Sequence, residues 1–179
     1  VAGDVVLLST TTVSDDATVD ITSGIDSTYG EYIFRFYNIH PATDSQEFLF
    51  QVNGAGESGF NETITSTVFR THHPESGIGA TISYDTSRDQ AQGTAYQKLS
   101  GPVGSGADES LAGILHLYSP ASTTYVKHFM CRCTVYYSLD AVYANHNAGY
   151  INTTTAIDEI SFKMSTGNFD GVIQMYGIS

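Results

Sequence analysis

The sequence predicts an all-β domain, a jelly-roll-like sandwich of two antiparallel sheets with at most one short helix. Three observations indicate this class. Segments such as Glu62–Arg70 and Ile160–Met164 alternate apolar and polar residues with a period of two, which is typical of strands with one buried face. Between such segments lie clusters of Gly, Ser, Thr, Asn and Asp, which favour turns. The chain also has 12 Tyr and 9 Phe, and aromatic residues favour pleated surfaces.

We expect about ten strands in a single domain over residues 1–179, because sandwiches of this length often form one unit. In chain order the candidate strands are Val5–Leu8, Ala17–Thr22, Glu31–His40, Glu47–Val52, Thr63–His72, a short segment at Tyr84, Leu111–Tyr118, Thr124–Tyr137, Gly149–Asn152, Ile157–Met164 and Val172–Ile178.

The first half of the chain contains the segment with the strongest strand pattern. Glu31–His40 has large side chains on both faces, so we expect it at the centre of a sheet, and Pro41 should end it because proline cannot donate to the ladder. We expect Glu47–Val52 to be its hairpin partner. In the middle of the chain, Ser87–Gln90 matches the spacing of a capping box, which predicts a short helix over residues 87–92.

The second half contains the longest predicted strand, Thr124–Tyr137. Its side chains separate into two sets that point to opposite faces: Phe129, Cys131, Cys133 and Val135 on one, and His128, Met130, Arg132 and Thr134 on the other. The segment after it, Asp140–Ala148, is rich in Asn and Ala and is expected to be a loop.

The charge of the chain excludes several partner classes. It carries 7 Lys+Arg against 19 Asp+Glu, a net charge of -12, which argues against binding nucleic acid or an anionic membrane surface. No apolar run of about 18 residues is present, so we expect no membrane insertion. The first residues lack a basic segment followed by an apolar one, so we expect no signal peptide.

Residue patterns for catalysis, cofactors and metals are weak. His72 and His73 are adjacent and should point to opposite faces, whereas His116 and His128 could meet across a hairpin. Cys131 and Cys133 are expected to be reduced core thiols, because two positions apart in a flat strand is near the upper limit for a disulfide. The chain has no nucleophile elbow, phosphate loop, dinucleotide fingerprint or zinc spacing, so we expect no catalytic residues, no cofactor and no metal.

Tyrosines around the Asn-rich segment are the best candidates for ligand or receptor contact. Exposed Tyr rings combined with Asn amides are a common means of contacting a sugar or a protein. Completion of a barrel end or a subunit contact is the alternative role for these tyrosines. The candidate contact residues are Tyr136, Tyr137, Tyr143, Asn145, His146, Asn147 and Tyr150.

Several segments of the chain resemble proteins of marine bacteriophages. They are Tyr32–Pro41, Thr123–Phe129, Gly149–Asp158, Phe162–Asp170 and Tyr176–Ile178, and the resemblance extends from about Thr18 onward. The chain is similar over these segments to virion structural proteins of tail-fibre or head-decoration type. The resemblance implies a location on the particle surface and transfers no catalytic residue.

These observations together favour a non-enzymatic virion protein that forms a homo-oligomer, most simply a trimer, and contacts other virion proteins. The first hypothesis is a tail-fibre or receptor-binding module whose loops, above all Asp140–Ala148, contact a host surface glycan or protein. The second is a capsid decoration protein that reinforces the head. The third is a glycan-cleaving tail depolymerase, which would need a pair of carboxyl groups in a cleft.

Overall fold

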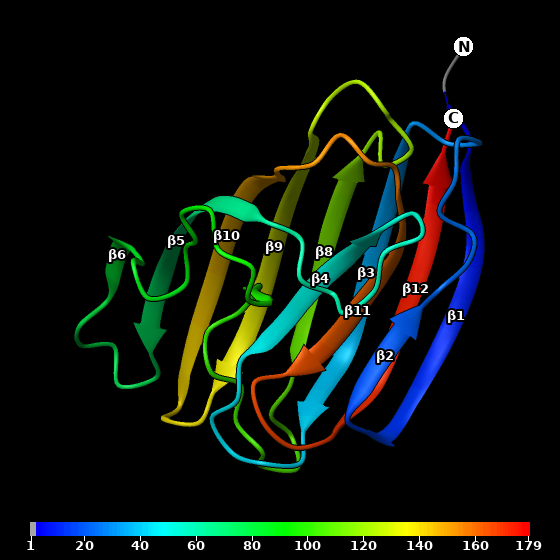
Figure 1. Cartoon of the computed structure of the whole chain (residues 1–179). Coiled ribbons are helices and arrows are strands. Elements are labelled where there is room, and N and C mark those ends of the chain that lie inside the picture. The colour runs from blue at the N-terminus through cyan, green and yellow to red at the C-terminus, as the bar shows by residue number, and fades with distance from the viewer. Residues whose placement is uncertain (1–2) are drawn as a thin grey trace.

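The structure is a computed structural model that describes residues 3–179, so Val1 and Ala2 of the expected domain lie outside the described residues. It confirms the all-β fold of two antiparallel sheets (Figure 1). The strands are β1 (Val5–Asp16), β2 (Thr18–Ile21), β3 (Glu31–Pro41), β4 (Phe48–Gly54), β5 (Ile64–Pro74), β6 (Thr81–Tyr84), β7 (Gln97–Lys98), β8 (Leu111–Tyr118), β9 (Lys127–Tyr137), β10 (Ala141–Ile151), β11 (Ile157–Met164) and β12 (Phe169–Ile178).

The order of the strands contains a jelly roll. The larger, eight-stranded sheet has the order β1-β12-β3-β8-β9-β10-β5-β6, and the four-stranded sheet has the order β2-β11-β4-β7. In each of the consecutive pairs β1/β2, β3/β4, β7/β8 and β11/β12, one strand lies in the larger sheet and the other in the smaller sheet. This is the connectivity of an eight-stranded jelly roll. The remaining strands, β9, β10, β5 and β6, continue the larger sheet beyond β8. We call these four strands the extension.

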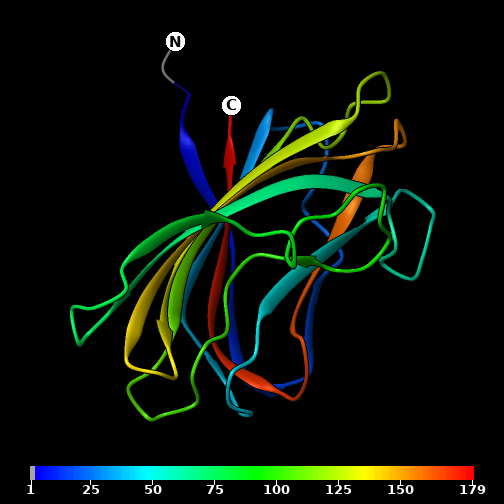
Figure 2. The same ribbon diagram turned by 90° about the vertical axis from the view of Figure 1, so that its left-hand side faces the viewer.

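One hydrophobic core lies between the two sheets, which Figure 2 shows from the side. At its centre Phe162 of β11 is fully buried. Its ring contacts Phe34, Phe36 and Phe48, with centroids 5.5, 5.3 and 5.8 Å away. Aromatic rings at such distances contribute dispersion and quadrupole attraction beyond the burial of their area. The alternation predicted from sequence therefore delivers the large side chains to one shared interior.

An irregular segment, residues 85–106, covers the inner side of the extension. Leu99 and Val103 are fully buried, and their backbone N–H groups donate to Phe48 O and Gln46 O, both at 2.8 Å. The prediction of a short helix over residues 87–92 is wrong. A turn replaces it, because the Asp85 carboxylate accepts hydrogen bonds from the N–H and hydroxyl of Ser87 and so competes with helical bonding.

Two further differences concern strand pairing and length. The expected hairpin of Glu31–His40 with Glu47–Val52 does not form, because β3 lies between β12 and β8 whereas β4 crosses to the other sheet. The expected loop Asp140–Ala148 is also wrong, since all of it except Asp140 belongs to β10. Both β8 and β11 have the bounds predicted from sequence, and β3 ends at Pro41 as expected.

Candidate functional site

The face of the larger sheet that is turned away from the smaller sheet is the candidate site. We call it the outer face. Along β9 burial alternates, with Phe129, Cys131, Cys133 and Val135 buried and the four residues between and before them exposed. This is the division predicted from sequence. The outward residues of β9 thus lie in solvent beside those of β8, β10 and β5.

The strand registers place the outward side chains in rows across the sheet. In the central row Phe69 of β5 lies opposite His146 of β10, which lies opposite Arg132 of β9, which lies opposite Ile114 of β8. The rings of Phe69 and His146 are stacked, with centroids 4.7 Å apart and an angle of 4° between their planes. Since Phe69 is 42% exposed, part of this stacked pair is accessible from solvent.

Three hollows follow β9 along the outer face, with volumes of about 540, 510 and 500 Å³. They occur where short residues lie beside large ones: Ala112 borders the first hollow, and Ala148 borders the second and the third. We call the three together the outer groove. From His128 to Tyr136 it extends over eight residue steps, or about 26 Å at the rise of a β-strand.

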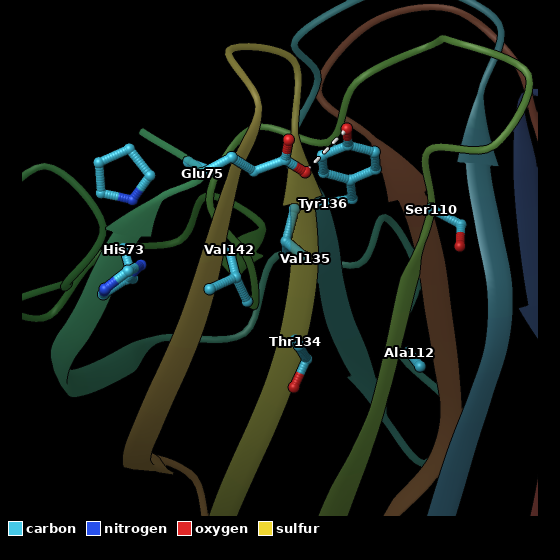
Figure 3. A pocket seen from close by; sticks show the side chains of 10 residues that line it. His73, Glu75, Ser110, Ala112, Thr134, Val135, Tyr136 and Val142 are labelled. Carbon is cyan, nitrogen blue, oxygen red and sulfur yellow. Dashed lines mark hydrogen bonds between the residues drawn. The ribbon is translucent and has the colours of Figure 1, made fainter. Parts of the chain in front are cut away.

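The first hollow is drawn in Figure 3. Ala112, Thr134 and Val142 project from three neighbouring strands, and His73 of β5 lies beyond Val142. Tyr136 closes the end of the groove, and its hydroxyl donates to Glu75 Oε1 at 3.4 Å (Figure 3). The negative charge of Glu75 is the main reason that the pKa of Tyr136 is raised above 10.0, with smaller contributions from burial and Asp140.

Charged groups are distributed unevenly around this groove. Strands β5, β8, β9 and β10 contain none of the 19 carboxylates of the chain, although they contain five of its six histidines. Arg132 lies in the middle hollow, where its side chain is exposed. Carboxylates approach the groove in two places: Glu75 and Asp140 lie near Tyr136 at one end, and Glu31 of β3 contacts His116 Nδ1 at 2.5 Å beside the middle hollow. The part of the middle hollow around Arg132 is therefore the part best suited to a negatively charged ligand.

The structure separates the predicted contact residues into two groups. Tyr136, His146 and Tyr150 line the outer groove, as their predicted role requires. The other four point inward: Tyr137 packs against the core, and Tyr143, Asn145 and Asn147 are buried. The reason is that the segment is a strand, so its consecutive side chains alternate between the two faces instead of sharing a loop surface.

The inward residues hold the covering segment against the extension. Asn145 Oδ1 accepts a hydrogen bond from Gly101 N at 2.9 Å, and Asn147 Nδ2 donates to Leu99 O at 2.7 Å. Tyr143 stacks on Tyr137 with ring centroids 4.8 Å apart, and burial raises the pKa of its hydroxyl above 10.0. These contacts satisfy buried polar groups, so their role is structural.

Sequence reasoning missed Phe69, His73 and Arg132 as groove residues. The sequence pattern did contain this information. The alternation of β9 placed Arg132 on the face away from Cys131 and Cys133, and the alternation of β5 pointed Phe69 to the face away from Val68. The missing step was strand order, which brings β5 next to β10 although 67 (Ala141 and Pro74) to 87 (Ile151 and Ile64) positions separate their paired residues. The expected meeting of His116 and His128 across a hairpin is not a direct pairing, because His116 lies opposite Met130 and contacts Glu31.

Other chemistry on the outer face is limited. The carboxylates Glu75 and Asp140 share the Tyr136 hydroxyl at 3.4 Å each, and both are exposed, so no burial difference assigns one as acid and the other as base. Within residues 3–179 no three His, Cys, Asp or Glu side chains converge as a metal site requires. In the same range no helix is long and apolar enough to cross a membrane.

The two cysteines belong to the interior. Cys131 and Cys133 are both buried and free, with their sulfur atoms 3.5 Å apart on the inner side of β9. Burial raises the pKa of the Cys131 thiol well above 9.0, and the neighbouring Cys133 raises it further. Because the thiolate is the reactive form, this environment disfavours reaction at Cys131.

Comparison with known proteins finds no family model and no curated protein that matches the chain. The fold and the groove therefore describe the class of protein: a jelly roll whose larger sheet is extended by four strands and carries an open groove on its outer face.

Proposed function

We propose that this chain is a non-enzymatic surface protein of a bacteriophage particle, of the tail-fibre or receptor-binding type, and that the outer groove is its attachment surface. The observation that carries the proposal is the groove itself. It is a long, open feature lined by aromatic rings, imidazoles and one arginine, on a sheet face that no other part of residues 3–179 covers. The resemblance to marine phage virion proteins supports the choice of particle.

Self-association is part of the proposal. Three consecutive apolar residues near the start of β1, Val5, Val6 and Leu7, are 55%, 40% and 51% exposed. They lie on an edge strand, where both the apolar side chains and one row of backbone hydrogen-bonding groups are available to a neighbouring copy. We infer a homo-oligomer, with a trimer as the first expectation. Analytical ultracentrifugation of the chain tests this, and a monomer at high concentration would contradict it.

Attachment is tested by filling the groove. Ala148 borders two hollows, so Ala148→Tyr places a ring between them and introduces a residue type that favours strands. Thr18→Tyr, at an exposed position of β2 on the other sheet, is the matched control. We expect the labelled chain to bind host cells, Ala148→Tyr to reduce that binding at least tenfold, and Thr18→Tyr to leave it unchanged. Equal binding by the two variants would refute the role of the groove.

The place in the particle is tested by counting copies. Quantitative mass spectrometry of purified particles should give a few oligomers per tail if the chain is a fibre component. Hundreds of copies would favour the capsid decoration protein instead, because that protein covers the head. Absence of the chain from purified particles would refute the proposal, and cleavage of a host glycan by the chain would replace it with the depolymerase.

A further inference from the structure

We infer that the outer groove binds a linear anionic glycan, a polysaccharide that carries carboxylate or sulfate groups. This inference rests on the proposed attachment function and names the chemistry of its ligand. It depends on one cation without a partner, a second cation in register with it, and the absence of carboxylates along the strands that form the groove.

Arg132 is the side chain that carries the inference. Of the seven Lys and Arg residues, the other six have partners: carboxylates for Arg70, Arg88 and Lys98, backbone carbonyls for Lys127, and aromatic rings for Arg35 and Lys163. Within residues 3–179 Arg132 has no ion pair, no side-chain hydrogen bond and no aromatic ring beneath it. Its guanidinium is therefore free to donate two parallel hydrogen bonds to a carboxylate or sulfate.

Arg35 extends the positive surface across the sheet. It lies on β3 opposite Ile114, which lies opposite Arg132, so the two arginines are in one row and two strands apart. Two strand spacings amount to about 10 Å. The guanidinium of Arg35 is held 4.9 Å above the ring of Tyr176, which fixes its position without neutralising its charge. Two cations in one row, of which Arg35 is held in position, suit a ligand with repeated negative charges.

The surroundings of these arginines favour an anion in a molecule that is otherwise negative. The net charge of the chain is -12, yet β5, β8, β9 and β10 contain no Asp or Glu. Carboxylates near the centre of the groove would repel an anionic ligand and would pair with Arg132. Their exclusion from 41 residues of strand leaves the arginine charge unopposed where the ligand would lie.

The shape of the groove favours a sugar chain over a folded protein. The hollows are open, follow β9, and are lined by rings, among them the stacked pair Phe69–His146 and the neighbours His128 and Tyr150. Flat rings present an apolar surface to the C–H face of a sugar, while His and Thr offer hydrogen bonds at the edges. A protein partner would need one continuous complementary surface and becomes an alternative outcome of the test.

The test measures binding of three hexasaccharides to the folded chain by titration calorimetry: an alginate oligomer with carboxylates, a carrageenan oligomer with sulfates, and a neutral laminarin oligomer. We expect at least one anionic oligomer to bind, with an affinity that falls as salt is raised, and the neutral oligomer to bind at least tenfold more weakly. The arms distinguish carboxylate from sulfate as the recognised group.

Variants with equal changes of charge locate the site. Arg132→Met should weaken anionic binding tenfold or more, the loss expected for one charge-assisted contact, and Arg132→Lys should recover only part of it. Lys163→Met, which removes the same charge from the smaller sheet, should change affinity less than twofold. Thermal unfolding of each variant confirms that it is folded.

Two results would overturn the inference, and they differ from failure of the proposed function. Equal affinity for neutral and anionic oligomers, or full affinity of Arg132→Met, would exclude recognition of charge in the groove. If none of the glycans binds but Ala148→Tyr still abolishes attachment to host cells, the groove is an attachment surface for a protein and only this inference fails. If attachment is also independent of the groove, both proposals fail.

Discussion

Replacing Arg88 with methionine should destabilise the protein by about 3 kcal/mol. Arg88 is 8% exposed and lies in the covering segment. Its guanidinium contacts the Asp85 carboxylate, contacts Glu47 Oε1 at 2.7 Å, and donates from Nε to Ser100 O at 3.2 Å. Removing one partner of a buried ion pair costs about 3–5 kcal/mol, because it leaves an uncompensated charge in the interior. The lower end applies here, since Arg70 still contacts Asp85 at 3.3 Å.

Unfolding in urea gives the measurement. Because the chain has no Trp, the transition is followed by far-ultraviolet circular dichroism or Tyr fluorescence. For a chain of this length, 3 kcal/mol corresponds to a fall in Tm of about 6–12 °C. Arg35→Met makes the same chemical change at an exposed position and should alter stability by less than about 1 kcal/mol. Adding Asp85→Asn to Arg88→Met should recover part of the loss, because it removes the charge left behind.

The difference between wild type and Arg88→Met should depend on pH. Burial alone would raise the pKa of Asp85, but the Ser87 hydroxyl and the Arg88 guanidinium outweigh it and hold the pKa below 3.8. A carboxyl whose folded pKa is depressed contributes stability that is complete above its unfolded pKa and is lost as pH falls through the folded pKa. The gap should therefore be full at neutral pH and narrow below about pH 4. A loss under about 1 kcal/mol, or a gap that persists in acid, would refute this account.

Three other predictions concern the core, a strand glycine and the thiols. Phe162→Ala should cost about 3–5 kcal/mol in urea unfolding, and Phe162→Leu clearly less; equal costs would contradict a packing role. Gly149→Ala should destabilise by about 1–3 kcal/mol, since its Cβ would lie 2.5 Å from Thr65 O, whereas Gly30→Ala, with open space around it, should be nearly neutral in thermal unfolding. A chromogenic disulfide reagent should label Cys131 and Cys133 only after denaturation, so rapid labelling of the native chain would disprove their burial.

Sequence patterns predicted the strands better than their partners. The alternation of β9 identified its buried and exposed sets residue by residue, because the period of a strand is a local property. The pairing of β3 was mistaken, because a short connection after Pro41 is compatible with a hairpin and with a crossing to the second sheet. Only packing of β4 against β11 decides between them, and those strands are far apart in sequence.

The failure at β10 has a specific physical cause. Asn145, Asn147 and Gly149 have low strand propensity, so the segment has the composition of a loop. In the fold both asparagines point inward, and one atom of each amide binds the backbone of the covering segment: Asn145 Oδ1 at Gly101 and Asn147 Nδ2 at Leu99. Those partners lie more than 40 positions away, and no local pattern announces them. Because β10 was predicted as a loop, it was also not predicted that the candidate contact residues point alternately to two faces of the sheet.

Strand β10 has a consequence for how the molecule can diverge. Its odd-numbered side chains are directed to the interior, while Val142, Ala144, His146 and Ala148 face outward, where His146 stacks on Phe69. Changes at Val142, Ala144 and Ala148 should alter the outer face while leaving folding nearly intact. Under the attachment function proposed above, such an arrangement would let the contact surface vary on an unchanging frame, and it offers a natural place to randomise in the search for new specificities.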